Sequence, residues 1–166
     1  MILKFKEFYP KIDSSAWIAP SADIIGNVVI GENSSVWFQC VIRSDVNEVI
    51  IGKNTNVQDL SMIHTDTHTK TILGDNVTIG HKVMLHGCTV EDNCLIGMSA
   101  TILDNAVIGE GSIVGANSLV TQGKKFPPRS LILGSPAKVV KELTQEDVDE
   151  LIAHAGRYVE YKNDYS

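Results

Sequence analysis

An aliphatic side chain recurs every six residues along most of this chain. The position is filled eighteen times between residues 12 and 120, always by Ile, Val or Leu, and fourteen of the seventeen intervals are six residues long. An α-helix offers no reason for a period of six, because its faces repeat every three to four residues. A solenoid whose coil is made of three short strands does, since each strand then supplies one interior residue. The repeating residues are Ile12, Ile18, Ile24, Ile30, Val36, Ile42, Ile51, Val57, Ile63, Leu73, Ile79, Leu85, Val90, Ile96, Ile102, Ile108, Val114 and Val120.

A second position, four residues after the aliphatic one, mostly holds a small side chain, as at Ala22, Ser34 and Cys40. Glycine often follows the aliphatic residue directly, where it relieves a turn. This pattern resembles that of the hexapeptide-repeat family, whose members form a left-handed parallel β-helix with a triangular cross-section. The resemblance covers residues 12–122. We therefore expect a mainly β fold, a left-handed parallel β-helix of about six triangular coils with a C-terminal α-helix.

The repeat is expected to end after Val120. Residues 122–130, QGKKFPPRS, are typical of a turn-rich link, and residues 131–142 of an extended return segment. Thr144 opens the sequence TQED, which resembles a capping box, so a helix should begin there and run to about Lys162. An apolar stripe predicts that this helix packs along the prism or on a neighbouring subunit. The stripe is Val148, Leu151, Ile152, Ala155 and Val159.

The length of 166 residues fits one structural domain. Within it we distinguish residues 1–125, the β-helix with an N-terminal cap, from residues 126–166, the linker, return segment and helix. His154 lies on the helix and is expected to pack or to be solvated.

Composition excludes several classes of partner. The net charge is −6 and no Lys/Arg cluster is present, so we expect no nucleic-acid binding. The N-terminal segment is too short and too charged for a signal peptide, and no apolar run has the length of a membrane span, so we expect no membrane association. Three cysteines without a CxxC motif favour a reducing compartment, and hence a cytoplasmic protein. Cys40, Cys88 and Cys94 fall at interior positions and should be buried, inert thiols.

Two histidines, His64 and His86, follow aliphatic residues that lie three repeats apart. Residues three repeats apart lie on the same face, one coil higher, so these two imidazoles should stack in one column. Arg43 occupies the same column one coil below. The three intervals that depart from six residues begin just after Arg43, His64 and His86. Departures from a fold's own rules tend to mark functional sites.

His81 belongs to the preceding face, where Asp59 lies one coil below it. The two stacked imidazoles of His64 and His86 supply two convergent nitrogens, and a third must come from elsewhere. In a three-fold homotrimer, the face that carries His81 on one subunit would meet the column of His64 and His86 on the next. The competing interpretation is that loops extend where a solenoid tolerates them and that exposed histidines have no role.

Three neutral imidazoles with an open fourth position suit Zn²⁺, and they also accept Fe²⁺ or Co²⁺. Such an ion lowers the pKa of bound water to about 7 and supplies hydroxide at neutral pH.

Three segments, VIRSDV, NTNVQDLSMIH and GHKVMLHG, look like the signature segments of the γ-class carbonic anhydrases and their close relatives. The resemblance implies a homotrimer in which metal hydroxide adds to CO₂ and gives bicarbonate. It implies that His64, His81 and His86 are the metal ligands, two from one subunit and one from its neighbour.

The same resemblance assigns roles to five further residues. Arg43 would pair across the interface with Asp59, and Asp45 would belong to the same network. Gln58 would hydrogen-bond the metal-bound water, and Asn56 would steady Gln58.

Two departures from the family pattern bear on the rate. The best-studied members carry an acidic loop with a proton-transferring glutamate after the first histidine, where this chain has the short TDTHTKT. Val46 stands after Asp45, where those members have a second glutamate. Asp66 or His68 could substitute as proton carriers, and without a substitute the expected activity is weak.

Two alternatives remain open. The first is an acyl-CoA-dependent acyltransferase or thioesterase, because GSPAK (residues 134–138) resembles the segment near the coenzyme A site of such hexapeptide enzymes. The second is a non-catalytic metal-binding or assembly subunit.

Overall fold

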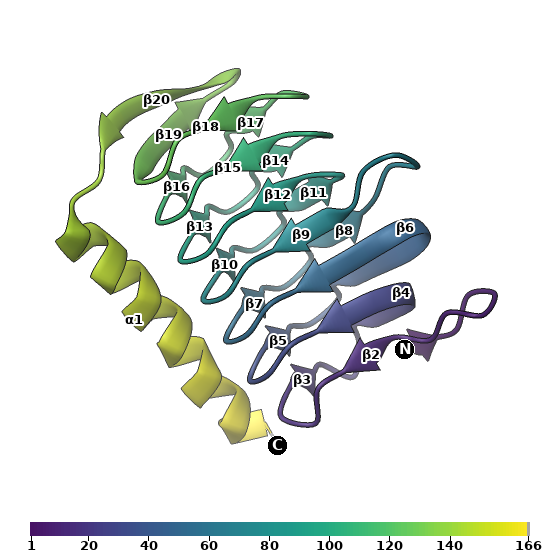
Figure 1. Cartoon of the computed structure of the whole chain (residues 1–166). Coiled ribbons are helices and arrows are strands. Elements are labelled where there is room, and N and C mark those ends of the chain that lie inside the picture. Colours follow the sequence, from purple (N-terminus) through teal and green to yellow (C-terminus); the bar gives the residue numbers. More distant parts are fainter. Residues whose placement is uncertain (166) are drawn as a thin grey trace.

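The computed structural model describes residues 1–165, which form a parallel β-solenoid flanked by one long helix (Figure 1). The predicted mainly β architecture, a left-handed parallel β-helix with a C-terminal α-helix, is confirmed. The strands are β1 (Ile2–Leu3), β2 (Lys11–Ile12), β3 (Trp17–Ile18), β4 (Asp23–Ile30), β5 (Ser35–Val36), β6 (Val41–Ile51), β7 (Asn56–Val57), β8 (Met62–His64), β9 (Thr71–Leu73), β10 (Thr78–Ile79), β11 (Met84–His86), β12 (Thr89–Val90), β13 (Leu95–Ile96), β14 (Thr101–Ile102), β15 (Val107–Ile108), β16 (Ile113–Val114), β17 (Leu119–Val120), β18 (Lys125–Phe126), β19 (Ser130–Gly134) and β20 (Ala137–Glu142).

The strands stack in three columns, one on each side of the prism. The first holds β8, β11, β14 and β17, the second holds β9, β12, β15 and β18, and the long strand β6 joins these two columns at their shared corner. The third column runs from β3 through β5, β7, β10, β13 and β16 to β19. Strand length is short because the chain turns a corner after almost every repeat.

The repeating aliphatic residues form the interior of the prism. Apart from Ile12 and Ile18 in the first coil, each of them is at most 1% exposed. Burying an aliphatic side chain of this size contributes about 1.5–3 kcal/mol relative to leaving it exposed. The stack of interior residues therefore sets the register of every coil on the next.

One corner of the prism carries a ladder of asparagines. Asn33, Asn54, Asn76 and Asn93 all have positive φ, and the side-chain amide of each of the first three donates to the asparagine one coil higher, over 3.3, 3.1 and 3.0 Å. Asparagine tolerates the left-handed conformation better than other side chains with a Cβ. The ladder ends at Glu110, which accepts from Asn93 at 3.1 Å.

The expectation that the repeat ends after Val120 was wrong. Phe126 and Ile132 continue the six-residue spacing, and their strands β18 and β19 pair in parallel with β15 and β16. Ile132 is fully buried in the core. The solenoid therefore has about seven turns rather than six, because an aromatic residue can fill the interior position that we restricted to Ile, Val and Leu.

The predicted return segment and helix are both present. Strand β20 runs antiparallel to β19. Helix α1 (Gln145–Tyr161) begins after Thr144, whose hydroxyl and backbone N–H form the predicted capping box with Asp147, and a short 3₁₀ helix, η1 (Lys162–Tyr165), follows it.

Helix α1 packs along its own chain and contacts β7 and β10 (Figure 1). Of the predicted stripe, Val148, Leu151 and Ala155 are buried, whereas Ile152 is 39% exposed. His154 packs as expected: its Nδ1 lies 3.2 Å from Thr78 Oγ1, and burial lowers the pKa of this imidazole.

The three cysteines are buried free thiols, as predicted. Burial raises the pKa of Cys40 to about 11 and the pKa values of Cys88 and Cys94 to about 12. Among residues 1–165, no helix combines the length and the apolar character needed to cross a bilayer.

Candidate metal centre

His64 and His86 stack as the period predicts. They are direct partners in the parallel pairing of β8 with β11, and Leu85 and Ile63, the buried residues before them, are paired in the same register. His64 Nδ1 lies 3.0 Å from His86 Nε2. The repeat thus places two imidazole nitrogens face to face at the end of adjacent strands.

A carboxylate braces each of these imidazoles on its other nitrogen. Asp45 Oδ1 lies 2.9 Å from His64 Nε2, and Asp104 Oδ1 lies 2.5 Å from His86 Nδ1. Asp45 comes from the corner of β6 and Asp104 from the corner that follows β14. The order through four successive coils is Asp45, His64, His86, Asp104.

Asp104 was missed by the sequence analysis. It lies two residues after the interior residue Ile102, whereas His86 lies one residue after Leu85. The available signal was its place at the same corner, one coil above His86, just as Asp45 lies one coil below His64.

The donor set fits a cation. A neutral imidazole carries one N–H, and a carboxylate on one nitrogen holds that hydrogen there. If both carboxylates accept an N–H, then His64 Nδ1 and His86 Nε2 direct two lone pairs at one another. Two ligands of a tetrahedral zinc ion lie about 3.3 Å apart, given Zn–N distances of about 2.0–2.1 Å. The observed 3.0 Å needs only a small opening to match this spacing.

Arg43 engages Asp45 within the chain. Its Nη1 pairs with Asp45 Oδ2, so the two oxygens of this carboxylate serve Arg43 and His64 separately. Desolvation raises the pKa of Asp45, but the hydrogen bonds from His64 and Arg43 outweigh it and hold that pKa below its ordinary value. The expected pairing of Arg43 with Asp59 involves a second copy of the chain and stays a prediction.

A second group of predicted residues lies around His81. Its Nδ1 is 2.9 Å from Asp59 Oδ2, and both side chains are about one-third or more exposed. Next to them, Gln58 is buried and its Nε2 donates to Asn56 Oδ1 at 3.1 Å. Tyr158 of helix α1 also hydrogen-bonds the Gln58 side chain. The carboxamide of Gln58 is therefore held from two sides.

The group around His81 borders an aromatic cavity of about 390 Å³ between helix α1 and the solenoid. Trp37, Phe38 and Tyr158 line it together with Asp59 and His81.

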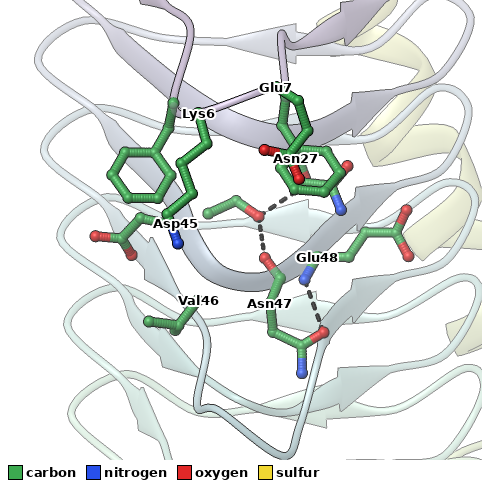
Figure 2. A pocket seen from close by; sticks show the side chains of 10 residues that line it. Lys6, Glu7, Asn27, Asp45, Val46, Asn47 and Glu48 are labelled. Atoms are coloured by element: carbon green, nitrogen blue, oxygen red, sulfur yellow. Dashed lines mark hydrogen bonds between the residues drawn. The ribbon is translucent and has the colours of Figure 1, made fainter.

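A second cavity, of about 310 Å³, lies at the corner of β6 that carries Asp45 (Figure 2). Asp45 and Val46 lie on one side of it, and Lys6 and Glu7 of the N-terminal turn lie across it. Ser44, at the base, donates to the backbone oxygen of Asn27 over 2.8 Å and fixes the bulged corner from which Asp45 projects.

The loop after His64 holds the two proposed proton carriers. Asp66 Oδ2 accepts the backbone N–H of His68 at 3.0 Å, and this hydrogen bond lowers the pKa of Asp66. His68 is exposed.

Within residues 1–165, no three His, Cys, Asp or Glu side chains are grouped so that they could together hold a metal ion. His64 and His86 converge at one corner of the prism, and His81 lies at another, beside Asp59. A single chain thus presents two imidazole donors at one place and a third elsewhere.

Comparisons with known proteins agree with this fold. The family model described as "Bacterial transferase hexapeptide (six repeats)" matches residues 9–44, 70–102 and 87–122. The "Probable carbonic anhydrase" of Methanocaldococcus jannaschii is 55% identical over 148 residues, which are 89% of this chain and 93% of that protein.

Two further comparisons extend this likeness. The "Gamma carbonic anhydrase 1, mitochondrial" of Arabidopsis thaliana is 44% identical over 155 residues. The matched region covers 90% of this chain and 56% of that protein. A crystal structure of a hexapeptide transferase family protein from Anaplasma phagocytophilum is 39% identical, covers 99% of this chain and 98% of its own, and superimposes with a TM-score of 0.95. This chain therefore belongs to the hexapeptide-repeat family and, within it, to the γ-class carbonic anhydrase-like branch.

Proposed function

We propose that this protein is a homotrimeric carbonic anhydrase-like metalloenzyme that converts CO₂ and water into bicarbonate and a proton. Each of its three subunit interfaces would hold one divalent ion, bound by His64 and His86 of one copy and His81 of the next. Zn²⁺ is the ion that a site of three imidazoles suits best, although Fe²⁺ and Co²⁺ also accept this donor set. The observation that carries the proposal is that one nitrogen of His64 faces one nitrogen of His86, while a carboxylate contacts the other nitrogen of each ring.

A partly exposed, mainly apolar column of side chains supports the proposed trimer. Val41, Met62, Met84 and Leu119 follow one another on the outer surface of β6, β8, β11 and β17, with Thr101 between the last two. Met84 is 39% exposed in the single chain, and nearby Leu60 is 48% exposed. This face lies between the corner of His81 and the corner of His86. A neighbouring subunit that covered the face would bring these two corners of different copies together.

A divalent ion bound by three imidazoles would supply a hydroxide nucleophile at neutral pH, because it lowers the pKa of its water from 15.7 to about 7. The residues of the chain position the reactants. The Gln58 carboxamide, held by Asn56 and Tyr158, would orient the attacking water by a hydrogen bond. Arg43 would fix the angle between subunits by pairing with Asp59 of the next copy, since a guanidinium can hold a carboxylate with two parallel hydrogen bonds.

In this mechanism, transfer of the released proton to solvent would limit the rate of turnover. The best proton carrier has a pKa near the working pH. Asp66 departs from that requirement, because the backbone N–H of His68 lowers its pKa further. The imidazole of His68, the other proposed carrier, is exposed on the same loop. Slow turnover follows unless a buffer molecule takes the proton.

Stopped-flow hydration of CO₂ by zinc-loaded protein tests the proposal. The wild-type protein should exceed both His81→Ala and His86→Ala by at least tenfold in kcat/KM, since each variant removes one ligand. Size measurement in solution should give three chains for all three proteins. A wild-type rate equal to that of His81→Ala would refute the proposed carbonic anhydrase activity.

The acyl-CoA-dependent alternative has one observation in its favour. The GSPAK segment forms the turn between β19 and β20 at the last coil of the prism, and all of its residues except Ala137 are exposed. Titration with acetyl-CoA separates the two functions, because saturable binding that leaves the metal content unchanged would favour the acyltransferase or thioesterase. Stoichiometric metal without turnover of CO₂ or thioesters would indicate the non-catalytic metal-binding subunit.

A further inference from the structure

The carboxylate of Asp104 has no assigned role in the proposed reaction. It lies at the corner that follows β14, one coil above His86, and its Oδ1 is 2.5 Å from His86 Nδ1. Both side chains are about one-third exposed, so the contact borders the protein surface next to the histidine pair.

Backbone hydrogen bonds to the coil below and to the coil above fix the position of the Asp104 corner along the solenoid axis. The N–H of Asn105 donates to the carbonyl oxygen of Gly87 at 2.7 Å, and the N–H of Gly123 donates to the carbonyl oxygen of Asp104 at 2.8 Å. The corner of Asp104 is thus tied to the corner below, directly after His86, and to the corner above. These two hydrogen bonds fix the backbone from which the Asp104 carboxylate reaches His86.

Gly87 leaves the space that this contact needs. It has a φ of +55°, and a Cβ added there would collide with the Asp104 carboxylate and lie 2.5 Å from Thr69 Oγ1. Any larger residue at position 87 would therefore require the side chains of both Asp104 and Thr69 to move. Glycine directly after His86 therefore leaves room for the Asp104 carboxylate of the coil above to contact the imidazole.

Hydrogen bonding decides which nitrogen of His86 can bind a metal. A carboxylate only accepts, so Asp104 holds the single N–H of neutral His86 on Nδ1 and leaves Nε2 with a free lone pair. Nε2 is the nitrogen that faces His64. Without Asp104, the hydrogen can move to Nε2, where it would block that donor.

We propose that Asp104 is a positioning residue of the metal site, which keeps His86 in the tautomer whose Nε2 binds the ion and fixes the plane of the ring. This role rests on the proposed function. Asp104 acts on the metal only through His86, in the way that Asp45 acts through His64.

The test compares Asp104→Ala and Asp104→Asn with wild type and with Asp92→Asn. Asp92 is a matched control, because its Oδ1 accepts the backbone N–H of Asp75 at 2.8 Å at a corner away from the histidines. Metal-free proteins are titrated with Co²⁺, whose visible absorption reports the ligand geometry. Thermal unfolding verifies that each variant is folded.

Asp104→Ala should bind Co²⁺ about 10- to 100-fold more weakly than wild type and with an altered spectrum, as expected for loss of a carboxylate that orients a ligand. Asp104→Asn should fall between the two, since its amide oxygen still accepts a hydrogen bond. Asp92→Asn should match wild type. Binding by Asp104→Ala within twofold of wild type, with the same spectrum, would overturn the proposal.

A second readout does not depend on the metal. Nitrogen-15 chemical shifts of the imidazoles in metal-free protein identify which nitrogen of His86 carries the hydrogen. Wild type should carry the hydrogen on Nδ1, and Asp104→Ala should shift it toward Nε2. Failure of wild type to bind Co²⁺ would refute the proposed function alone. An unchanged His86 tautomer in Asp104→Ala would refute the role of Asp104.

Discussion

Nδ1 of His64 faces Nε2 of His86 across 3.0 Å, one coil apart on the same column of the solenoid. Asp45 and Asp104 complete the column, one at each end, so four polar residues form a ladder on a prism whose interior is aliphatic. Every prediction below about metal binding depends on this ladder.

Gly87→Ala should weaken the metal site and the fold together. The left-handed backbone at this position disfavours a Cβ by about 1–2 kcal/mol, and the new methyl group would push Asp104 away from His86. We expect a loss of unfolding free energy of that size together with weaker Co²⁺ binding. Denaturant unfolding and metal titration measure the two effects. Gly156→Ala, which meets nothing within 4 Å on helix α1, is the control. It should leave the metal affinity unchanged and raise the unfolding free energy by about 0.4–1 kcal/mol, because alanine loses less conformational entropy than glycine when the helix forms. Unchanged Co²⁺ affinity in Gly87→Ala would contradict the packing argument.

Val46→Glu should accelerate turnover. Val46 is 52% exposed, follows Asp45, the residue that contacts His64, and borders the cavity at the corner of β6 (Figure 2). A glutamate there would restore the residue that the best-studied members of the family carry directly after this aspartate, and it would give the released proton an acceptor next to Asp45. We expect a several-fold higher kcat for CO₂ hydration at low buffer concentration, an unchanged kcat/KM, and a smaller gain at high buffer concentration.

Val46→Gln serves as the matched variant, because it adds polarity and length without an ionisable group. Equal rates for the glutamate and glutamine variants would show that proton removal does not limit turnover.

The cysteines should resist alkylation in the native protein. Burial raises the pKa of Cys40 to about 11, so at pH 8 only about one thiol in a thousand is the reactive thiolate. Cys88 and Cys94, with pKa values near 12, should react more slowly still. A disulfide reagent at pH 8 should titrate no thiol until denaturant is added, and three afterwards. Reactivity should rise as the pH approaches 11. Rapid modification of one cysteine at pH 8 in folded protein would contradict the burial.

His154→Ala should not change metal binding. This imidazole lies on helix α1 against Thr78, and burial lowers its pKa, so it packs in the neutral form. Loss of the hydrogen bond should cost about 1 kcal/mol of unfolding free energy. Metal content and CO₂ hydration should equal those of wild type. Loss of bound metal in this variant would mean that a fourth histidine belongs to the site.

The sequence allowed the column of His64 and His86 to be predicted because parallel coils stack interior residues in strict register. A residue next to an interior position inherits that register, and both histidines stand directly after one. The capping box at Thr144 was equally predictable, since a local hydrogen-bond pattern specifies it.

Two features escaped the same reasoning for physical reasons. Asp104 reaches His86 through its side chain from a position one residue further along the corner, and aspartates occur at other corners for structural reasons, as at Asp75 and Asp92. Arg43 was assigned a partner by family likeness, but within one chain its guanidinium turns to the neighbouring Asp45. Spacing predicts which column a residue joins but not the direction of a long side chain.

The most direct test of the central claim is metal binding by mixed subunits. His64→Ala and His81→Ala chains are purified separately, unfolded, and refolded alone or as an equal mixture. Each variant alone should refold without tightly bound zinc. In the mixture, about one interface in four would combine intact His64 and His86 from one chain with intact His81 from the next, because the interface is head-to-tail. The account predicts about one quarter of a zinc ion per chain in the mixture. Zinc content that stays at the level of the separate variants would contradict a site shared between subunits.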